Sequence, residues 1–272
     1  MAAEPGIVIT GGTRGLGRAL AERFLLLGAS VFITGRDGAV LERALRDLSR
    51  KAPGRRIGGA TGDVGRSEDL ERAAREAQAF LGGIDHWINN AGISQEPGRL
   101  WELSPDEMER VVRTDLLGPL FSVRAALPAL EASKGFLWFM EGHGSDGRFI
   151  DGMSLYGTTK RGVAYIWRCL AKEARGRGIR VGALSPGIMA TDFTLQNREK
   201  TSPEKWERTA RVFNILADQP ETVAAFLAPR VLAARKSGTR IAWLTNAKVM
   251  RRFLAAPFVK RHIIEEALSR RS

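Results

Sequence analysis

Cysteine is almost absent from this sequence of 272 residues. The single Cys169 cannot form a disulfide within the chain, and it lies in an apolar helical stretch with no second ligand residue nearby, so we expect a small core residue. No zinc-finger spacing is present either. These absences exclude a fold stapled by disulfides, and they predict that the chain binds no metal.

Long hydrophobic runs are missing as well. No apolar run approaches the ~20 residues that a membrane-spanning helix needs. The N-terminal residues MAAEPGIVIT lead at once into a strand pattern rather than into a signal segment. We therefore expect a cytoplasmic or other intracellular protein that does not span a membrane.

Acidic residues are fewer than basic ones. The chain has 30 Asp and Glu against 42 Lys and Arg, which gives a formal net charge of +12. Such a balance favours anionic partners, for example phosphates or anionic lipid. No basic run is interleaved with stacking aromatic residues, so we predict no nucleic-acid partner and expect much of the excess charge on solvated helix surfaces.

Strand-like apolar runs and amphipathic segments of helical length alternate along the chain, which is typical of a parallel sheet. A composition of 44% hydrophobic and 26% charged residues suits a folded domain. We predict an α/β fold: a Rossmann-type doubly wound parallel sheet of about seven strands in a single domain, 1–272. The predicted strands lie near residues 6–10, 30–34, 56–60, 84–88, 135–140, 179–184 and 240–244, and the predicted helices near 16–28, 38–51, 67–81, 105–132 and 154–175.

Two details of this pattern concern helix ends and a long connection. Ser104 precedes Pro105 in the manner of a helix cap followed by proline at the first helical position. The polar, charged stretch 192–219 is only weakly helical in pattern, and it follows Pro186-Gly187. We predict that 192–219 is a long connection over a cleft and a candidate lid.

A glycine-rich loop connects the first predicted strand to the first predicted helix. Its glycines allow the backbone to turn sharply and to approach a pyrophosphate, whose charge the free amides at the helix N-terminus would meet. Strand, loop and helix follow one another in the order that a dinucleotide site requires. The loop residues that we expect at the cofactor are Thr10, Gly11, Thr13, Arg14, Gly15, Leu16 and Gly17.

The end of the second strand favours NADP(H) over NAD. A ribose 2′-hydroxyl calls for an acidic acceptor there, whereas a 2′-phosphate calls for a basic partner. Arg36 occupies this position, and Arg14 lies inside the glycine loop. Asp37 follows directly and could instead cap the next helix.

Tyr156 and Lys160 lie four residues apart, on one face of a predicted helix. A free phenol has a pKa of about 10, so proton transfer near neutrality would require that pKa to fall by roughly three units, which a desolvated neighbouring cation can supply. The spacing also occurs by chance, as a surface Tyr and Lys on an exposed helix.

Four motifs together make the chain resemble the short-chain dehydrogenase/reductase family along nearly its whole length. They are TGGTRGLG at 10–17, NNAG at 89–92, YGTTK at 156–160, and SPG at 185–187 followed by Thr191. The resemblance implies that Tyr156 is the acid in reduction or the base in oxidation, and that Lys160 binds the nicotinamide ribose and lowers the pKa of Tyr156. It also implies cofactor contacts at Asp63, Val64, Asn90, Ala91, Gly92, Pro186, Gly187, Ile188 and Thr191.

The chain departs from the family pattern at two positions. Thirteen residues before the tyrosine, where the family usually has a serine that orients the substrate, this chain has His143. Ser145 would reach the same point if the loop is remodelled, and we prefer it over Ser154, which could equally be a helix cap. Asp115 stands where the family commonly has an asparagine that supports a proton path to the lysine; a carboxylate accepts hydrogen bonds but cannot donate as an amide does.

The segment from Met140 to Tyr156 is similar to the chlorophyll b reductase branch of the family, in which a run like MEGHGSDG also precedes the tyrosine. This similarity implies an NADPH-dependent reduction of the 7-formyl group of chlorophyll b or chlorophyllide b to 7-hydroxymethyl. Another bulky, apolar aldehyde, ketone or alcohol is the direct alternative. A different class also stays open: an NADP(H)-binding regulatory protein in which the changes at His143 and Asp115 impair catalysis.

The tail 246–272 mixes apolar with basic residues. Such a segment could contact an anionic membrane surface peripherally, which would suit a pigment or lipid substrate. It could equally pack over the chain's own cleft or against a sister subunit, since relatives commonly form homo-oligomers. Pro257 argues against one continuous helix here.

Overall fold

The computed structural model describes residues 4–96, 98–149, 151–191 and 202–269. Their seven strands form one parallel sheet in the order β3-β2-β1-β4-β5-β6-β7. The order reverses between β1 and β4, and in such sheets a ligand crevice opens at the carboxyl ends of the strands at that point. The predicted doubly wound fold is confirmed. The strands are β1 Gly6–Ile9, β2 Ser30–Gly35, β3 Ile57–Thr61, β4 His86–Asn89, β5 Phe136–Met140, β6 Arg180–Ser185 and β7 Thr239–Ala242.

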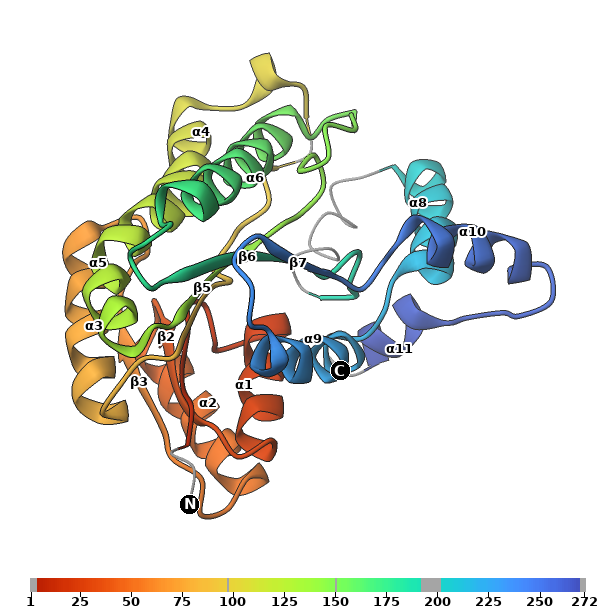
Figure 1. The fold of residues 1–272 in the computed structure, drawn as a ribbon. Helices are drawn as coiled ribbons and strands as arrows, with labels where there is room; N and C mark the ends of the chain where they lie inside the picture. The colour runs from red at the N-terminus through yellow and green to blue at the C-terminus, as the bar shows by residue number, and fades with distance from the viewer. Residues whose placement is uncertain (1–3, 97, 150, 192–201, 270–272) are drawn as a thin grey trace.

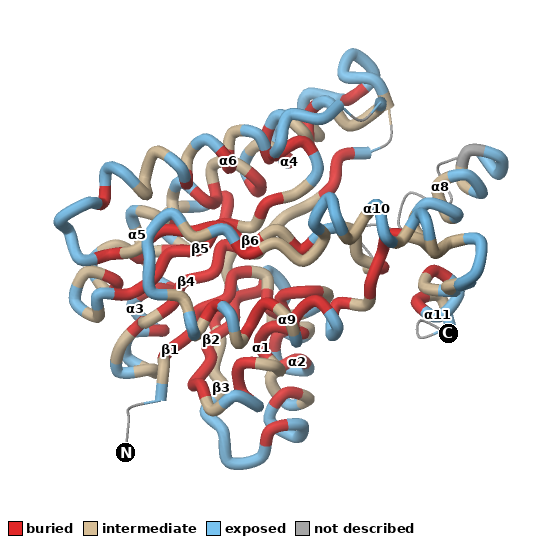
Figure 2. Tube along the Cα trace, turned by 45° about the vertical axis from the view of Figure 1, so that its right-hand side comes forward, coloured by how far each residue is buried: buried red, intermediate tan, exposed pale blue. Residues whose placement is uncertain are grey.

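Helices cover both faces of the sheet (Figure 1). On one face lie α1 (Gly15–Leu26), α2 (Gly38–Lys51) and α9 (Pro220–Ala233), which share a core with Trp138. On the other lie α3 (Ser67–Leu81), α5 (Gly118–Ser133) and α6 (Ser154–Glu173), packed around Trp87 and Phe139. Every residue of β1, β2 and β4 is buried, as Figure 2 shows in red at the centre of the molecule. Burial on both faces explains why these strands are apolar without alternation.

The helix predicted over 105–132 is present but interrupted. It consists of α4 (Pro105–Val112), a π turn η2 (Arg113–Leu117), and α5, and a short 3-10 turn η1 (Leu100–Glu102) precedes it. Ser104 caps α4 as predicted, since its hydroxyl accepts a hydrogen bond from the Glu107 amide at 3.2 Å. The π turn buries Thr114 and Asp115, and turns of this kind frequently mark functional sites.

The second half of the chain adds helices that the hydrophobic pattern did not reveal. Residues 192–201 of the predicted lid lie outside the described residues, and most of its remainder forms α8 (Pro203–Leu216). Helix α9 was missed by the sequence pattern because it is apolar on nearly all sides. The tail forms α10 (Asn246–Ala255) and α11 (Ile263–Ser269), with Pro257 between them. In Figure 1, α8, α10 and α11 lie to one side of the sheet.

Candidate active site

The glycine loop is built for a close backbone approach. A Cβ atom at Gly17 would lie 2.2 Å from the Gly11 carbonyl oxygen, so only glycine lets the loop fold back onto the start of α1. At the N-cap of α1, Arg14 makes no side-chain hydrogen bond to the first turn, and that turn contains no acidic residue. The positive end of the helix dipole therefore faces outward without a carboxylate to compensate it. This geometry fits the pyrophosphate of a dinucleotide.

Thr10 and Asn90 join the glycine loop to the end of β4. The Thr10 hydroxyl accepts hydrogen bonds from the amides of Asn90 and Ala91, each at 3.1 Å. The Asn90 side-chain amide donates to the carbonyls of Thr10 and Gly11, each at 3.0 Å. The structure thus brings the first two motifs together, and Asn90 acts here as a support for the loop.

A pocket with four arginines lies beyond the end of β2. Asp63 and Arg36 line it together, and the Asp63 carboxylate accepts from the Gly65 amide at 2.9 Å. Neither Arg36 nor Arg66 makes an ion pair among the described residues, and both are exposed. Asp37, in contrast, caps α2 by accepting from the Val40 amide at 3.0 Å. The other residues of this pocket are Gly65, Asp106, Glu109, Arg110, Arg113 and Thr114.

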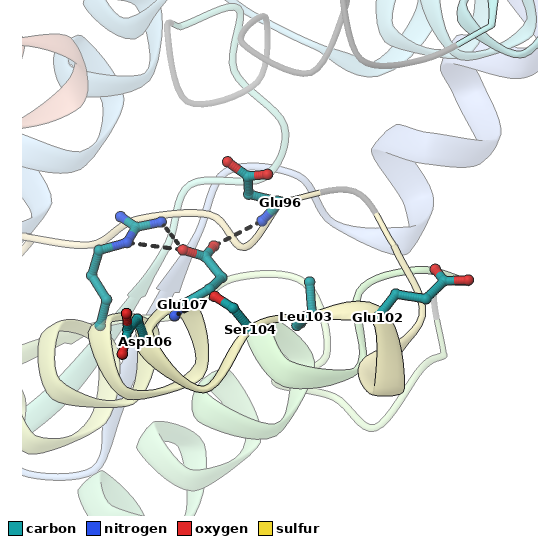
Figure 3. Close-up of a pocket in the computed structure, with 7 residues that line it drawn as sticks. Glu96, Glu102, Leu103, Ser104, Asp106 and Glu107 are labelled. Carbon is teal, nitrogen blue, oxygen red and sulfur yellow. Dashed lines mark hydrogen bonds and ion pairs between the residues drawn. The ribbon is translucent and has the colours of Figure 1, made fainter.

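A second pocket, shown in Figure 3, contains none of the predicted site residues. Glu96, Glu102, Asp106 and Glu107 line it, and the Glu107 carboxylate accepts from the Glu96 amide at 2.9 Å and pairs with Arg110. Four carboxylic acids around one guanidinium disfavour an anionic ligand. Of the two pockets, the one with Arg36 is therefore the better candidate for binding the 2′-phosphate of a dinucleotide.

Tyr156 and Lys160 lie in the first turns of α6, and both side chains are buried. The Lys160 Nζ atom is 5.2 Å from the centre of the Tyr156 ring and 2.9 Å from the Asp115 Oδ2 atom. Asp115 is fully buried, and its Oδ1 atom accepts from the Ile93 amide at 2.8 Å. A tyrosine, a lysine and a carboxylate thus meet in one buried cluster.

The pKa of Tyr156 differs from the expectation. Burial and, to a smaller extent, the Asp115 charge raise this pKa, the Lys160 cation lowers it, and the net result is a pKa of about 12. Lys160 therefore shifts the pKa of Tyr156 in the expected direction. The expectation that this shift brings the pKa close to 7 is wrong for the chain alone. The phenol stays protonated at neutral pH, which is the form that donates a proton.

Asp115 and Lys160 affect one another within the pair. Burial raises the pKa of the Asp115 carboxyl against the opposing pull of the Lys160 cation. Burial lowers the pKa of Lys160, but the charge of Asp115 and its hydrogen bond to Lys160, together with Tyr156 in its ionised form, outweigh burial and leave that pKa raised. Lys160 therefore remains a cation next to the phenol.

Ser145 is buried close to this cluster, whereas His143 and Ser154 are exposed. The Ser145 hydroxyl accepts from the Gly142 amide at 3.0 Å and donates to the Lys160 carbonyl at 3.2 Å. A Cβ atom at Gly142 would lie 2.5 Å from the Tyr156 phenol oxygen. The loop that carries Ser145 therefore passes directly against the phenol, and Ser154 is not the cap of α6, since that position is Met153.

Gln95 is a site residue that the sequence did not reveal. Its side-chain oxygen accepts from the Tyr156 amide at 2.8 Å, and its amide group donates to the Gly152 carbonyl at 2.9 Å. It is 1% exposed. Gln95 thus fixes the start of α6 and the loop before it, and its only signal in the sequence is its place three residues after NNAG.

The remaining predicted cofactor residues surround the same edge of the sheet. Thr191 lies by the glycine loop, because a Cβ atom at Gly15 would be 3.7 Å from its methyl carbon. Val64 packs under Gly118, which would bring a Cβ atom within 3.0 Å of it. Pro186, Gly187 and Ile188 follow β6, and the Ile188 carbonyl accepts from the Asp218 amide at 3.1 Å.

No group of three or more His, Cys, Asp and Glu residues in the described part of the chain is placed to hold a metal ion. No helix within it is both long and apolar enough to cross a bilayer.

The geometry and the motifs identify one family. A family model described as short chain dehydrogenase matches residues 6–202, and the chain belongs to this family of oxidoreductases. The probable chlorophyll(ide) b reductase NYC1 of Arabidopsis thaliana is 30% identical over 261 residues, which cover 90% of this chain and 51% of that protein. The chlorophyll(ide) b reductase NOL of the same plant is 34% identical over 252 residues, covering 89% and 70%. The chain thus spans about half the length of NYC1.

Solved structures agree on the fold. Levodione reductase superposes with a TM-score of 0.78 at 25% identity, covering 89% of this chain and 96% of that one. The KRED1-Pglu enzyme gives a TM-score of 0.74 at 28% identity, covering 86% and 99%. A metagenomic short-chain oxidoreductase in complex with NADP has a TM-score of 0.71, but at 24% identity it shows the fold alone.

Proposed function

We propose that this chain is a reductase that uses NADPH to convert a carbonyl group to an alcohol. The bound cofactor would supply the hydride to the carbonyl carbon, and Tyr156 would donate its phenolic proton to the carbonyl oxygen. The observation that supports Tyr156 as the proton donor is its burial beside Lys160, with a pKa of about 12 that keeps the phenol protonated at neutral pH. An alkoxide is a stronger base than this phenolate, so the proton transfer is favourable.

The other residues of the cluster would hold the reactants. Lys160 would bind the ribose next to the nicotinamide and return a proton toward Tyr156, with Asp115 as its acceptor partner 2.9 Å away. Ser145 would orient the carbonyl oxygen beside the phenol. Pro186, Gly187, Ile188 and Thr191 would flank the nicotinamide amide, and Asp63 and Val64 would lie by the adenine.

NADP(H) is proposed over NAD(H) on the charges of one pocket. Four guanidinium groups, those of Arg36, Arg66, Arg110 and Arg113, line the pocket beyond β2. Arg110 and Arg113 pair with Glu107 and Glu109, so Arg36 and Arg66 are the two that remain for a 2′-phosphate. Guanidinium groups bind phosphate in bidentate geometry.

The proposed substrate is the 7-formyl group of chlorophyll b or chlorophyllide b. The support is the similarity to the two plant chlorophyll(ide) b reductases at 30% and 34% identity, together with the shared run before Tyr156. Reduction of another bulky, apolar aldehyde or ketone is the alternative. Since chlorophylls partition into lipid, the proposal includes peripheral contact of the tail with a membrane. It also includes assembly into a homo-oligomer, which is common among relatives.

The test is turnover of NADPH with chlorophyll b, chlorophyllide b and a panel of bulky aldehydes and ketones in detergent, with product analysis by chromatography. We expect 7-hydroxymethyl pigment, and no product from the Tyr156→Phe variant. If only other carbonyls react, the pigment assignment is wrong and the reductase assignment stands. If NADPH binds and neither the wild type nor the variant turns over, the chain is an NADP(H)-binding regulatory protein instead.

A further inference from the structure

Large apolar side chains are exposed side by side on α10 and the turn after it. α10 contains no buried residue, and in Figure 2 it is drawn only in the colours of exposed and intermediate residues. We call this set, with the basic residues beside it, the α10 surface. Its apolar members and their exposed fractions are Met250 (66%), Phe253 (45%), Leu254 (71%), Phe258 (87%) and Val259 (57%).

All charged residues of the α10 surface are basic. Between Leu244 and Ile264 the sequence has five Lys and Arg residues and no Asp or Glu. Arg251 and Lys260 are exposed among the apolar side chains. Apolar side chains next to cations, with no anion between them, match the chemistry of an anionic lipid surface.

One buried carboxylate holds this segment in place. Asp218 pairs with both Arg252 and Arg261 at 2.8 Å, and it accepts from the Trp243 indole at 2.6 Å. The same residue pairs in a parallel β-bridge with Met189, which lies two residues after Gly187. The two guanidinium groups therefore anchor the tail to the loop that follows β6. The apolar residues of α10 are not buried in the core.

The α10 surface continues onto the loop before Tyr156. The Arg148 guanidinium donates to the side-chain oxygen of Asn246, the first residue of α10, at 3.2 Å. The next residue, Phe149, is 101% exposed. Arg148 follows Ser145 by three positions, so the surface lies next to the loop that approaches the Tyr156 phenol.

We propose that the α10 surface docks on an anionic lipid bilayer, with Phe149 and the apolar residues of α10 and its turn inserted at the headgroup level. Docking in this orientation turns the loop before Tyr156 toward the lipid, so that an apolar substrate passes from the bilayer to the site without crossing water. A second copy of the chain is disfavoured as the occupant, because two-fold pairing would set one basic surface against another. The delivery of an apolar substrate from the bilayer rests on the proposed function. The binding of the α10 surface to lipid does not depend on which substrate the site takes.

The test is co-sedimentation of the full chain with vesicles of phosphatidylcholine, with and without phosphatidylglycerol, at low and high salt. We expect the wild type to pellet with the anionic vesicles and to be released by salt. The variants are Phe253→Ser/Leu254→Ser/Phe258→Ser and Arg251→Glu/Lys260→Glu, each expected to lower partitioning about tenfold or more. The matched control, Leu26→Ser/Trp101→Ser, removes two other exposed apolar side chains and should bind as the wild type does.

The outcomes separate this inference from the proposed function. Turnover of a water-soluble aldehyde without vesicles, together with the melting temperature, shows that each variant is folded and active. A wild type that stays in the supernatant with anionic vesicles overturns the proposal, as do variants that pellet equally. A wild-type dimer in sedimentation velocity that the apolar variant dissociates, without vesicle binding, assigns the surface to self-association and overturns it too.

Discussion

The Nζ atom of Lys160 lies 2.9 Å from the Oδ2 atom of Asp115, with 8% and 0% of the two side chains exposed. In place of the asparagine that the family resemblance implies, this chain therefore has a carboxyl group paired with the lysine of the buried cluster. The charge of Asp115 keeps Lys160 cationic, and it also raises the pKa of Tyr156. The pair therefore favours a protonated phenol, the form in which Tyr156 can donate a proton.

The first prediction concerns pH. Reduction requires the protonated phenol, so activity is present below the pKa of Tyr156 and is lost as the pH rises through it. With that pKa at about 12, kcat/KM for reduction should show no alkaline loss from about pH 7 to about pH 10. Asp115→Asn removes a charge that raises the pKa of Tyr156, so its alkaline loss should begin at lower pH.

The measurement is kcat/KM against pH for the wild type and Asp115→Asn. Asp47→Asn serves as a control, because Asp47 pairs with Arg18 on the surface, far along the chain from Tyr156. Profiles of the wild type and Asp115→Asn that coincide would show that Asp115 does not set the pKa of the tyrosine.

The second prediction concerns cofactor choice. Arg36→Ala and Arg66→Ala should each weaken NADPH binding by about ten- to a hundredfold, the range expected when one hydrogen bond to a charged group is lost. NADH binding should change little, since it has no 2′-phosphate. Arg46→Ala is the control, because Arg46 is equally exposed on α2 and pairs with Glu42. The measurement is the dissociation constant of each variant for NADPH and for NADH, from nucleotide fluorescence. Equal losses of affinity for both nucleotides would contradict the prediction.

The third prediction concerns Gln95. Gln95→Leu keeps the volume but removes the acceptor of the Tyr156 amide and the donor to Gly152. Leaving a buried amide unpaired costs about 1–3 kcal/mol, so the melting temperature should fall and kcat should fall more than KM rises. Gln78→Leu, on the exposed side of α3, should leave both unchanged. If kcat of Gln95→Leu equals the wild-type value, Gln95 does not position Tyr156.

The fourth prediction concerns Gly142. Gly142→Ala places a methyl group 2.5 Å from the phenol oxygen of Tyr156, so the loop or the phenol must move. A displaced proton donor should lower kcat at least about tenfold, in keeping with the sensitivity of catalysis to small misplacements. Gly83→Ala is the matched control, because a Cβ atom at Gly83 would have no atom within 4 Å. Equal kcat values for the two variants would contradict this account of the loop.

The parallel sheet and the glycine loop were predictable because they follow from local rules, and the residues of the cluster were predictable from the family resemblance. Buried parallel strands read as apolar runs, and the glycines at 11, 15 and 17 signal a tight loop at a helix start. The strand bounds differ from the predicted ones by one or two residues, and helices up to α6 were found with similar accuracy, apart from the π turn that divides the predicted helix 105–132.

Other features depend on contacts between distant parts of the chain. The π turn buries Asp115 against Lys160 and the Ile93 amide, neither of which is nearby in sequence. The pKa of Tyr156 depends on how much water its surroundings exclude. Asp218 looked like an ordinary residue of a polar stretch, whereas it anchors Arg252 and Arg261.

The central claim is that this chain transfers hydride to a pigment carbonyl with Tyr156 as the proton donor. The most direct measurement uses NADPH that carries deuterium on the transferred position, chlorophyllide b in detergent, and mass spectrometry of the pigment. The account predicts a 7-hydroxymethyl product with one deuterium from the wild type. It also predicts a loss of about 10²- to 10⁴-fold in rate for Tyr156→Phe with NADPH binding retained. Pigment that stays unreduced while the protein binds NADPH, or equal rates for both proteins, would contradict it.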